Sequence, residues 1–285
     1  MQRKKVSIAI PASVVADTPH LREKTSKIGL IGRAAAIFGV DQIVIYPDNP
    51  KTDQGKEMNL IRLLLSYMET PQYLRKRLFK LQPELQFAGI LSPLRTPHHP
   101  LNAKAQNLEV GEYREGATVS KTDQGTLVDI GVERPALVCD VEMSMNKRIT
   151  VRIAKVGKEV EAEVAGREET QEYWGYSATI ERRPLGKILE DKTFDLAIAT
   201  SRYGIPFAQV AKEMKGEWEK SSNIFVAFGS PARGLHEIVK TEGLSLPEVV
   251  DFVVNTIPFQ GTETVRTEEA LIASLAVLRA CVSNV

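Results

Sequence analysis

Val6-Ser-Ile-Ala-Ile10 is the first of two short β-branched stretches, and Gln42-Ile-Val-Ile-Tyr46 is the second. Their composition, and the prolines that follow them, are typical of buried strands. Between them, apolar residues fall at helical spacing in two stripes, one of Ile28, Ile31, Ala35 and Phe38 and one of Leu30, Ala34 and Ile37. A helix that is apolar on two sides packs in an interior. Strand, helix and strand within about 40 residues predict a βαβ unit, and therefore a parallel sheet.

The following stretch predicts one more helix and then a boundary. Apolar residues over 55–69 fall on one helical face, and a basic turn is expected at 73–79. Three prolines then occur within Ser92-Pro-Leu-Arg-Thr-Pro-His-His-Pro100. This stretch can continue neither a helix nor a central strand, so we interpret it as a linker.

The pattern changes to all-β after this linker and returns to βα alternation near residue 194. Short strand-like runs separated by turn residues predict a small barrel within residues 108–180. Later strands are expected at 194–200, 224–228 and 249–254, with helices starting at Pro206 and covering 267–279. We therefore expect an α/β domain made of residues 1–92 and 184–285, split by a β-barrel domain at 93–183.

Composition narrows the class of protein. Of the 285 residues, 43% are hydrophobic and 26% are charged, which excludes a disordered or collagen-like chain. No apolar run is long enough for a membrane helix, and the N-terminus lacks a signal-peptide core, so an intracellular, cytoplasmic protein without a membrane partner is expected. Cys139 and Cys281 lie in apolar stretches and are expected to be small buried hydrophobes.

The charge is unevenly distributed, although the net charge is only +1. Residues 1–92 hold 14 Lys and Arg against 8 Asp and Glu. A basic segment in a nearly neutral protein favours an anionic partner such as nucleic acid. Solvated helix faces would give the same pattern, so charge alone leaves both interpretations open.

Three loops in the C-terminal part follow predicted strands and indicate a ligand site. They are Phe228-Gly-Ser-Pro-Ala-Arg-Gly234, Asn255-Thr-Ile-Pro-Phe-Gln260 and Gly261-Thr-Glu-Thr-Val-Arg266. Ligands of open parallel sheets bind where such loops converge, and glycine lets the backbone approach a ligand closely. Ordinary turns would explain each loop separately. The chain lacks a phosphate-binding GxxxxGK[ST] loop, which disfavours nucleotide hydrolysis.

Several longer stretches together resemble one known family. They are Lys27-Ile-Gly-Leu-Ile-Gly-Arg-Ala-Ala-Ala-Ile-Phe-Gly-Val-Asp41, the proline-rich 92–100, Tyr173-Trp-Gly-Tyr176, Thr200-Ser-Arg-Tyr-Gly204 and Pro258-Phe-Gln-Gly-Thr-Glu-Thr-Val-Arg-Thr-Glu-Glu269. The chain resembles the archaeal and eukaryotic SPOUT RNA methyltransferases that carry an inserted OB-like domain. The resemblance implies a SPOUT-type α/β fold with a parallel sheet and a C-terminal trefoil knot, plus an inserted OB-like β-barrel. It also implies a homodimer that uses S-adenosylmethionine to methylate RNA, with uridine N3 in ribosomal RNA as the target.

Carried over to this sequence, the resemblance implies the site residues. The cofactor would be bound by Thr200, Gly229, Asn255, Thr256, Ile257, Gln260, Gly261, Thr262 and Thr264. Arg33 and Arg202 are the candidate catalytic residues, because a guanidinium can hold a phosphate or stabilise an anionic base. Arg22, Lys24 and Lys27 are expected to bind RNA phosphates. Glu263 is a weaker candidate base, since a loop glutamate is usually solvated.

Other interpretations stay open at the level of sequence. A non-catalytic RNA-binding or ribosome-assembly factor would retain the same fold, and the absence of an obvious general base favours it. A small-molecule methyltransferase would need neither the barrel nor the basic segment. His98 and His99 suggest a metal site but fit a rigid linker better. The aromatic 173–176 stretch could stack on bases or join the two domains.

Overall fold

The computed structural model describes residues 3–282 and divides the chain into two compact units, each of which is described separately. The first unit contains the chain up to Ser66, Gln86–Ser92 and the chain from Tyr176 onward. The second contains Tyr67–Leu85 and Pro93–Gly175. In the described part of the chain, every helix is too short or too polar to cross a bilayer.

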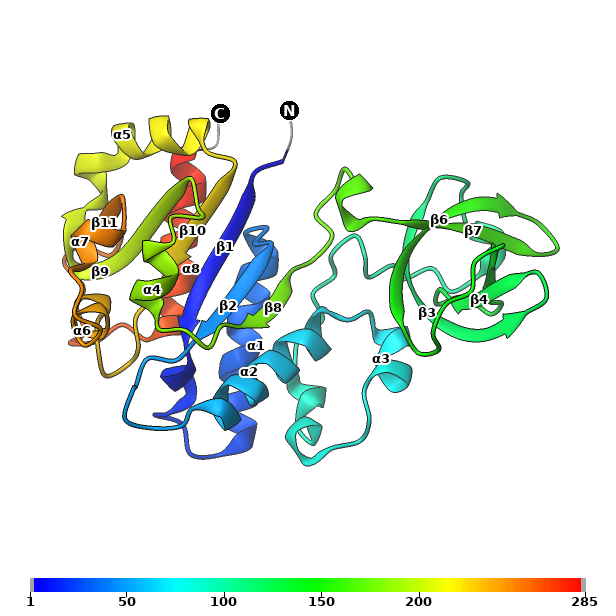
Figure 1. The fold of residues 1–285 in the computed structure, drawn as a ribbon, viewed down its shortest axis with the longest axis horizontal. Helices are drawn as coiled ribbons and strands as arrows, with labels where there is room; N and C mark the ends of the chain where they lie inside the picture. The colour runs from blue at the N-terminus through cyan, green and yellow to red at the C-terminus, as the bar shows by residue number, and fades with distance from the viewer. Residues whose placement is uncertain (1–2, 283–285) are drawn as a thin grey trace. The chain divides into compact units, whose positions relative to one another are not determined.

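A six-stranded parallel sheet forms the centre of the first unit (Figure 1). Its order is β11-β9-β10-β1-β2-β8, so strands from both ends of the chain lie side by side in one sheet. The strands are β1 (Lys5–Pro11), β2 (Gln42–Tyr46), β8 (Ser177–Ile180), β9 (Leu196–Pro206), β10 (Asn223–Ala227) and β11 (Phe252–Asn255). The expected parallel α/β sheet is therefore confirmed.

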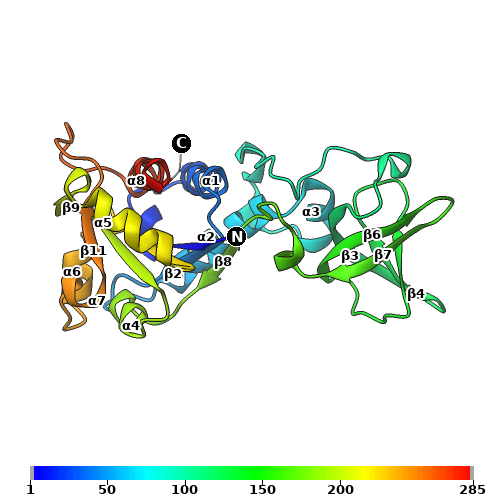
Figure 2. The same cartoon turned by 90° about the horizontal axis from the view of Figure 1, so that it is seen from above.

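Helices cover both faces of this sheet (Figure 2). α4 (Leu185–Glu190), α6 (Leu235–Lys240) and α7 (Leu246–Val249) pack on the face that bears Ala9, Val44 and Phe225. α1 (Leu21–Ile37) and α8 (Thr267–Val282) lie on the opposite face and contact each other. α5 (Phe207–Lys220) contacts α8, and α2 (Gly55–Glu69) follows β2. Because both faces are covered, the strands are apolar at successive positions, as the sequence pattern indicated.

The strand expected at 249–254 is present as β11, but it begins three residues later, at Phe252, because Val249 ends the short helix α7 and packs into the core under the sheet. Three other local expectations were wrong. The basic stretch 73–79 is mostly helix α3 (Gln72–Leu78) rather than a turn. The short strand Ser177–Ile180 pairs with β2 in the main sheet instead of joining the barrel. Cys139 is exposed and Cys281 is half-buried, so neither is a fully buried hydrophobe.

The two apolar stripes of α1 meet different surroundings. Ile28, Ile31 and Ala35 are fully buried against the sheet, as expected. Within the single chain, however, Leu30 is 48% exposed and Ile37 is 62% exposed. Ala34 of the second stripe is buried, so only Leu30 and Ile37 are left uncovered by the elements of this chain.

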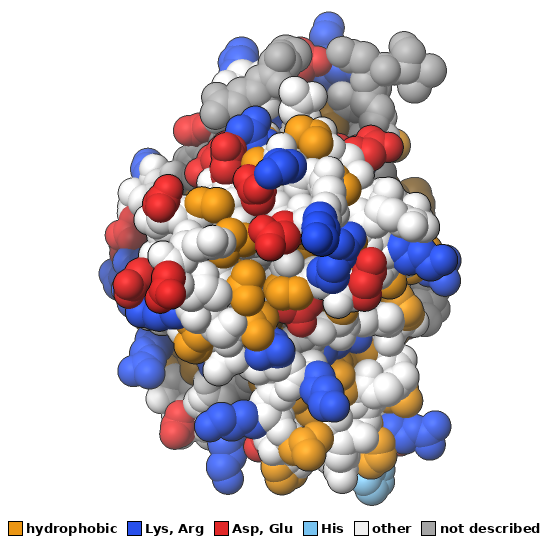
Figure 3. Space-filling model, turned by 90° about the vertical axis from the view of Figure 1, so that its right-hand side faces the viewer, with side chains coloured by type: hydrophobic (Ala, Val, Ile, Leu, Met, Phe, Trp, Pro, Cys, Tyr) orange, Lys and Arg blue, Asp and Glu red, His pale blue; other side chains and the backbone are white. Residues whose placement is uncertain are grey.

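A closed five-stranded barrel forms most of the second unit. Its strands are β3 (Tyr113–Thr122), β4 (Gly125–Asp129), β5 (Ala136–Cys139), β6 (Arg148–Val156) and β7 (Val160–Ala165), in the ring order β3-β4-β5-β7-β6. Only the β5–β7 pairing is parallel. Inward-facing aliphatic residues such as Val128, Val151 and Val160 fill the barrel. On the face shown in Figure 3, basic and acidic side chains are interspersed.

Short 3-10 helices complete the described secondary structure. They are η1 (Ala12–Val15), η2 (Pro83–Leu85), η3 (Ala88–Ile90), η4 (Ala105–Asn107) and η5 (Arg167–Glu169). η1 directly follows β1, so the chain turns at the carboxyl edge of the sheet before α1 begins. That edge is where the functional loops are found.

Candidate active site

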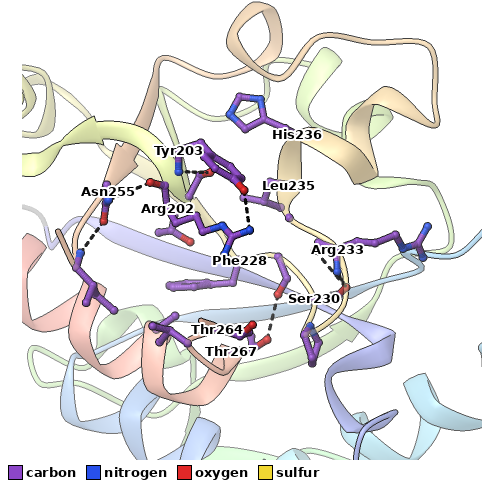
Figure 4. A pocket seen from close by; sticks show the side chains of 18 of the residues that line it. Arg202, Tyr203, Phe228, Ser230, Arg233, Leu235, His236, Asn255, Thr264 and Thr267 are labelled. Carbon is purple, nitrogen blue, oxygen red and sulfur yellow. Dashed lines mark hydrogen bonds between the residues drawn. The ribbon is translucent and has the colours of Figure 1, made fainter. Parts of the chain in front are cut away.

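A pocket of about 340 Å³ lies at the carboxyl ends of β9, β10 and β11 (Figure 4). Residues 200–203, 228–237 and parts of 255–274 line it. Its volume falls in the range of small-molecule and cofactor sites. Its position is also the one where open parallel sheets bind ligands. The three loops singled out in the sequence thus converge on one cavity, and the C-terminal part of β9 also lines it.

The first lining segment is an arch within β9. Along β11, Val253 pairs with Ala199, whereas the next residue, Val254, pairs with Ile205. Residues 200–204 are therefore pushed out of the ladder, as in an extended bulge. Glycine is needed at position 204, because a Cβ there would lie 2.6 Å from the carbonyl carbon of Val254. The arch presents its side chains to the pocket while both of its ends stay in the sheet.

Arg202 and Tyr203 are the outermost residues of this arch. Nη2 of Arg202 donates a hydrogen bond to the Tyr203 hydroxyl oxygen at 2.6 Å, and the guanidinium carbon lies 4.7 Å from the ring centroid. Nη1 of Arg202 donates to the carbonyl oxygen of Glu263 at 2.9 Å. Both partners are neutral, so these contacts fix the arginine without cancelling its charge.

The second segment follows β10 and approaches the pocket with backbone. A Cβ on Gly229 would lie 3.2 Å from both the Arg233 carbonyl oxygen and the Leu235 nitrogen, so the turn is built around the missing side chain. The Thr267 hydroxyl at the start of α8 donates to the Gly229 carbonyl at 3.0 Å. The Tyr46 hydroxyl donates to the carbonyl of Phe228 at 2.7 Å. Two other elements therefore hold this loop in place.

Arg233 connects the same loop to the end of β2. Its Nη2 donates to the Asp48 carbonyl oxygen at 2.6 Å, and the Asp48 carboxylate lies 3.6 Å away. Asp48 is buried and also accepts hydrogen bonds from Ser13 and Gln54. This network ties the loops after β1, β2 and β10 together, which makes that wall of the pocket rigid.

The third segment runs from β11 to α8. Asn255 donates from Nδ2 to the Arg202 carbonyl at 3.0 Å and accepts from the Ile257 backbone at 2.9 Å. The Thr256 and Ser274 hydroxyls are 2.7 Å apart and share a hydrogen bond. The Gln260 side chain donates to the carbonyl oxygens of Thr262 and Glu263. Side-chain amides therefore hold this loop in a defined course around the pocket.

The structure brings most of the predicted cofactor residues together. Thr200, Gly229, Asn255, Thr256, Ile257, Gln260 and Thr264 line the pocket, as does the candidate catalytic residue Arg202. Gly261 and Thr262 lie on the same loop but are not among the lining residues, and a Cβ at Gly261 would enter open space. Arg33 lies near the end of α1 and does not line this pocket.

Of the three predicted phosphate-binding residues, Arg22 is exposed and Lys24 is half-buried, both in the first turn of α1. Lys27 differs, because its side chain is only 7% exposed. Its ammonium group lies 2.8 Å from Asp17 and 3.5 Å from the buried Glu268 of α8. The charge of Lys27 is used inside the protein to join α1 to α8, so Arg22 and Lys24 are the members of this set that solvent reaches.

Several polar residues that line the pocket were not assigned from the sequence, among them Tyr203, Ser230, Arg233 and His236. Tyr203 and Arg233 lie within motifs quoted above, and these motifs were the only indication in the sequence that the two residues belong to the site. Figure 4 shows Tyr203 and His236 on the same side of the pocket, from β9 and α6. Only the arch and the tertiary course of the loops bring these side chains to one place.

A second polar cluster lies in the interior of the second unit. Arg148 Nη1 lies 2.6 Å from a carboxylate oxygen of Glu69, and Arg148 also pairs with Glu115. Arg167 reaches both carboxylates at 3.3 and 3.5 Å, and the Trp174 indole donates to Glu115 at 2.7 Å. Burial alone would raise the pKa of Glu69, but Arg148 and the other donors lower it well below its ordinary value. The cluster holds ionised groups in a dry interior.

His98 and His99 belong to this cluster rather than to a metal site. Both Nε2 atoms lie within hydrogen-bond distance of the Glu69 carbonyl oxygen, at 3.0 and 2.7 Å. Within residues 3–282, no group of three or more His, Cys, Asp or Glu side chains could hold a metal ion. The indole of Trp174 is buried here as well, so it offers no open face to a base.

Comparison with known proteins identifies a family that this chain matches. Residues 5–278 match the family described as "Putative RNA methyltransferase". The chain is 32% identical over 304 residues to the human 28S rRNA (uridine-N(3))-methyltransferase, covering 96% of this chain and 77% of that protein. It is 32% identical over 308 residues to the mouse protein of the same name, with 96% and 76% covered. An uncharacterized protein of Halobacterium salinarum is 32% identical over 287 residues, with 95% and 98% covered.

Proposed function

The chain belongs to this family of RNA methyltransferases, and on that premise we propose that it methylates N3 of a uridine in ribosomal RNA with S-adenosylmethionine as methyl donor. The substrate is suggested by the names of the human, mouse and Drosophila melanogaster relatives. The structural observation that carries the proposal is the convergence of three loops and the β9 arch on one cofactor-sized pocket. The cytoplasmic location stays a prediction.

The lining of the pocket suits S-adenosylmethionine, which combines a flat apolar base, a ribose and a charged amino acid. Leu235, Ile257 and Val265 offer apolar surface for the adenine. Gly229 lines the pocket and presents only backbone to the ligand. Thr200, Asn255 and Thr264 would hold the ribose and amino-acid groups, and the uncancelled charge of Arg202 suits a carboxylate or an anionic base.

When bound, the cofactor supplies a methyl group on a sulfonium: the carbon–sulfur bond breaks with its electron pair left on sulfur, the new carbon–nitrogen bond uses the lone pair of uridine N3, and the N3 proton passes to water. The protein's residues would hold the base in line with that methyl group and exclude other orientations. They would also stabilise the negative charge that the base acquires as its proton leaves.

We propose that the C-terminal loop forms the trefoil knot of a SPOUT fold. After the edge strand β11, the chain crosses the β9 arch, where Asn255 and Arg202 are hydrogen bonded and Arg202 donates to the carbonyl of Glu263. It then enters α8 beside Gly229 of the neighbouring β10 loop. A segment held between two loops in this way is the course that a knot requires. The ring order of the inserted barrel likewise supports an OB-like domain.

A homodimer is the second part of this proposal. On α1, Leu30 and Ile37 are exposed, and on the adjacent α8, Ile272 is 42% exposed. α8 is apolar nearly all round from Leu271 to Leu278, and such a helix is normally buried. A second copy would cover this surface. An Ile272→Asp substitution should shift the mass measured by light scattering from dimer to monomer.

The test of the function is transfer of radiolabelled methyl groups from S-adenosylmethionine to total RNA from cells that lack this protein. Incorporation is expected in ribosomal RNA, and mass spectrometry of the digested RNA should identify 3-methyluridine. A different methylated nucleoside would correct the target atom. Cofactor binding without any transfer, with ribosomal precursors supplied, would contradict the proposal and favour a non-catalytic assembly factor.

A further inference from the structure

Tyr203 is a solvent-exposed tyrosine at the mouth of the pocket. Its side chain is 74% exposed although it lines the cavity, and it comes from the β9 arch (Figure 4). A large aromatic side chain in this position is reachable by a macromolecular substrate as well as by a small ligand. What the residue can do depends on how its hydroxyl group is engaged.

The tyrosine is held in a defined orientation. Arg202 lies over its ring and donates to its hydroxyl at 2.6 Å, while the same guanidinium is fixed to the Glu263 carbonyl. The backbone nitrogen of Tyr203 donates to the Ser201 hydroxyl at 3.2 Å. Gly204 anchors the next residue tightly against β11. The side chain is thus held by Arg202 and its backbone by two neighbouring residues, which makes the exposed tyrosine preorganised rather than mobile.

The donors and acceptors available to the Arg202 and Tyr203 side chains decide the role of the Tyr203 hydroxyl. Arginine has donors only, whereas a phenol has one donor and two acceptor sites. In the Arg202–Tyr203 pair the phenolic oxygen must therefore accept. The hydrogen of the Tyr203 hydroxyl is left to point away from the arginine, toward an acceptor outside this pair. The arginine polarises that O–H group, which strengthens the bond it donates.

A uracil base offers a matching acceptor. Its N3 lies between two carbonyl groups, and loss of the N3 proton places negative charge on their oxygens. A fixed donor at one of these oxygens stabilises the anion from which methylation proceeds. Cytosine carries an amino group at one of the two positions, so a donor placed there also favours uracil.

Resting on the proposed function, we propose that Tyr203 is a catalytic residue that donates its hydroxyl hydrogen to a carbonyl oxygen beside the methylated nitrogen, and that Arg202 is the positioning residue that orients it. Two adjacent residues of the β9 arch would thus share the stabilisation of the base: one donates the hydrogen bond and the other orients the donor. Stabilising the uracil anion also makes the N3 proton easier to remove, so that water can take it.

The test compares the wild-type protein with Tyr203→Phe, using total RNA from cells lacking the protein and 3-methyluridine measured by mass spectrometry over a range of pH. The variant keeps the ring and loses only the O–H group. We expect the rate of transfer to fall by about 10- to 100-fold at neutral pH. The rising limb of the pH profile should move to higher pH, because the base must lose its proton without the hydrogen bond. The affinity for S-adenosylmethionine by calorimetry should be unchanged.

Tyr67→Phe is the matched control. Tyr67 also has an arginine over its ring, with Arg75 at 4.8 Å, but it lies outside the pocket. The other titratable groups that line the pocket are Arg202, Arg233, His236, Glu237 and Glu263, and the Tyr203→Phe protein shares all of them with the wild type. A difference between the two pH profiles therefore reports on the hydroxyl of Tyr203.

The outcomes separate this inference from the function on which it rests. A Tyr203→Phe protein with the wild-type rate and pH profile would overturn the role of Tyr203 while leaving the methyltransferase intact. An equal loss at every pH, or a loss of cofactor affinity, would also overturn it, because either points to a structural or cofactor-binding role. A wild-type protein that binds cofactor but methylates no RNA would refute the function itself, and this inference with it.

Discussion

Arg148 in the buried cluster of the second unit and Arg202 in the pocket of the first are both held rigidly, but by opposite kinds of partner. Arg148 contacts the carboxylates of Glu69 and Glu115, so its charge is cancelled in a dry interior. Arg202 contacts a carbonyl oxygen and a phenolic oxygen, both neutral, and its side chain is exposed. The groups that an arginine contacts therefore decide whether its charge stabilises the fold or is available to a ligand. Its presence in a sequence motif does not decide this.

The largest effect on stability should come from a substitution in the buried cluster. Arg148→Ala would leave the carboxylates of Glu69 and Glu115 buried without their main counterion, which should destabilise the second unit by about 3–5 kcal/mol. Urea denaturation of the whole protein, with amide hydrogen exchange of β6, would measure the loss. Arg152→Ala is the matched control on the same strand, because its pair with Glu163 is exposed and should contribute at most about 1 kcal/mol. Equal losses in the two variants would contradict the distinction.

In the pocket, Arg202→Ala should lower the rate of methyl transfer and leave the stability of the fold unchanged. Removing the residue that orients Tyr203 should lower methyl transfer by up to about 100-fold, as much as the loss of the hydroxyl itself. The melting temperature should stay at the wild-type value, since the side chain is exposed. Because Arg202 acts through Tyr203, the double variant with Tyr203→Phe should be little worse than Arg202→Ala alone. Additive losses would show that the two residues act independently.

Acid should destabilise the fold through His99, which lies in the buried cluster. Burial, reinforced by the neighbouring His98, lowers the pKa of His99 from 6.5 to about 4. Between these values the unfolded chain binds a proton that the folded chain does not, so stability is full above about pH 6.5 and falls as the pH drops to about 4. We expect a loss on the order of 2 kcal/mol from this residue. Below about pH 4.5 a further loss should begin, because the pKa of Glu69 is also lowered in the fold.

Urea unfolding at a series of pH values would measure this effect. His99→Asn should flatten the profile between pH 6.5 and 4, whereas His20→Asn, at an exposed position before α1, should leave it as in the wild type. An unchanged slope in His99→Asn would show that another group controls the acid sensitivity.

The smallest expected effect concerns the backbone of the pocket. Gly229→Ala adds a Cβ that would lie 3.2 Å from two backbone atoms of the β10 loop, so the loop must shift by a few tenths of an ångström. We expect about a tenfold loss of affinity for S-adenosylmethionine, measured by calorimetry. Gly89→Ala is the control, since a Cβ there meets nothing within 4 Å. A Gly229 variant with full affinity would place the cofactor away from this turn.

Strong local patterns predicted much of the fold. The β-branched run at 42–46 and the amphipathic stretch 55–69 became β2 and α2 with the expected bounds. Prediction failed where local and tertiary preferences differ. Val249 ends a helix instead of starting a strand because its side chain completes the core beneath the sheet, and 177–180 form a strand beside β2 instead of joining the barrel.

The site was predictable to a similar degree. Loops that follow parallel strands meet at one edge, so the sequence could indicate Gly229, Asn255 and Thr264 as neighbours. It could not indicate Tyr203, whose exposure at the pocket depends on the register jump between Val253 and Val254. Nor could it show that Lys27, one of four basic residues on the same helix, is buried against Asp17 and Glu268.

The sequence by itself determined the parallel α/β sheet, the presence of a separate β-barrel and the family, because periodicity and long motifs are local properties of the chain. The tertiary structure alone decided which charges are cancelled and which stay available. Arg148 and Arg202 are chemically identical, and only the packing around them places two carboxylates beside the first and a tyrosine hydroxyl beside the second. The interaction of a charge with its surroundings depends on distance and burial, which no pattern of residues along the chain specifies.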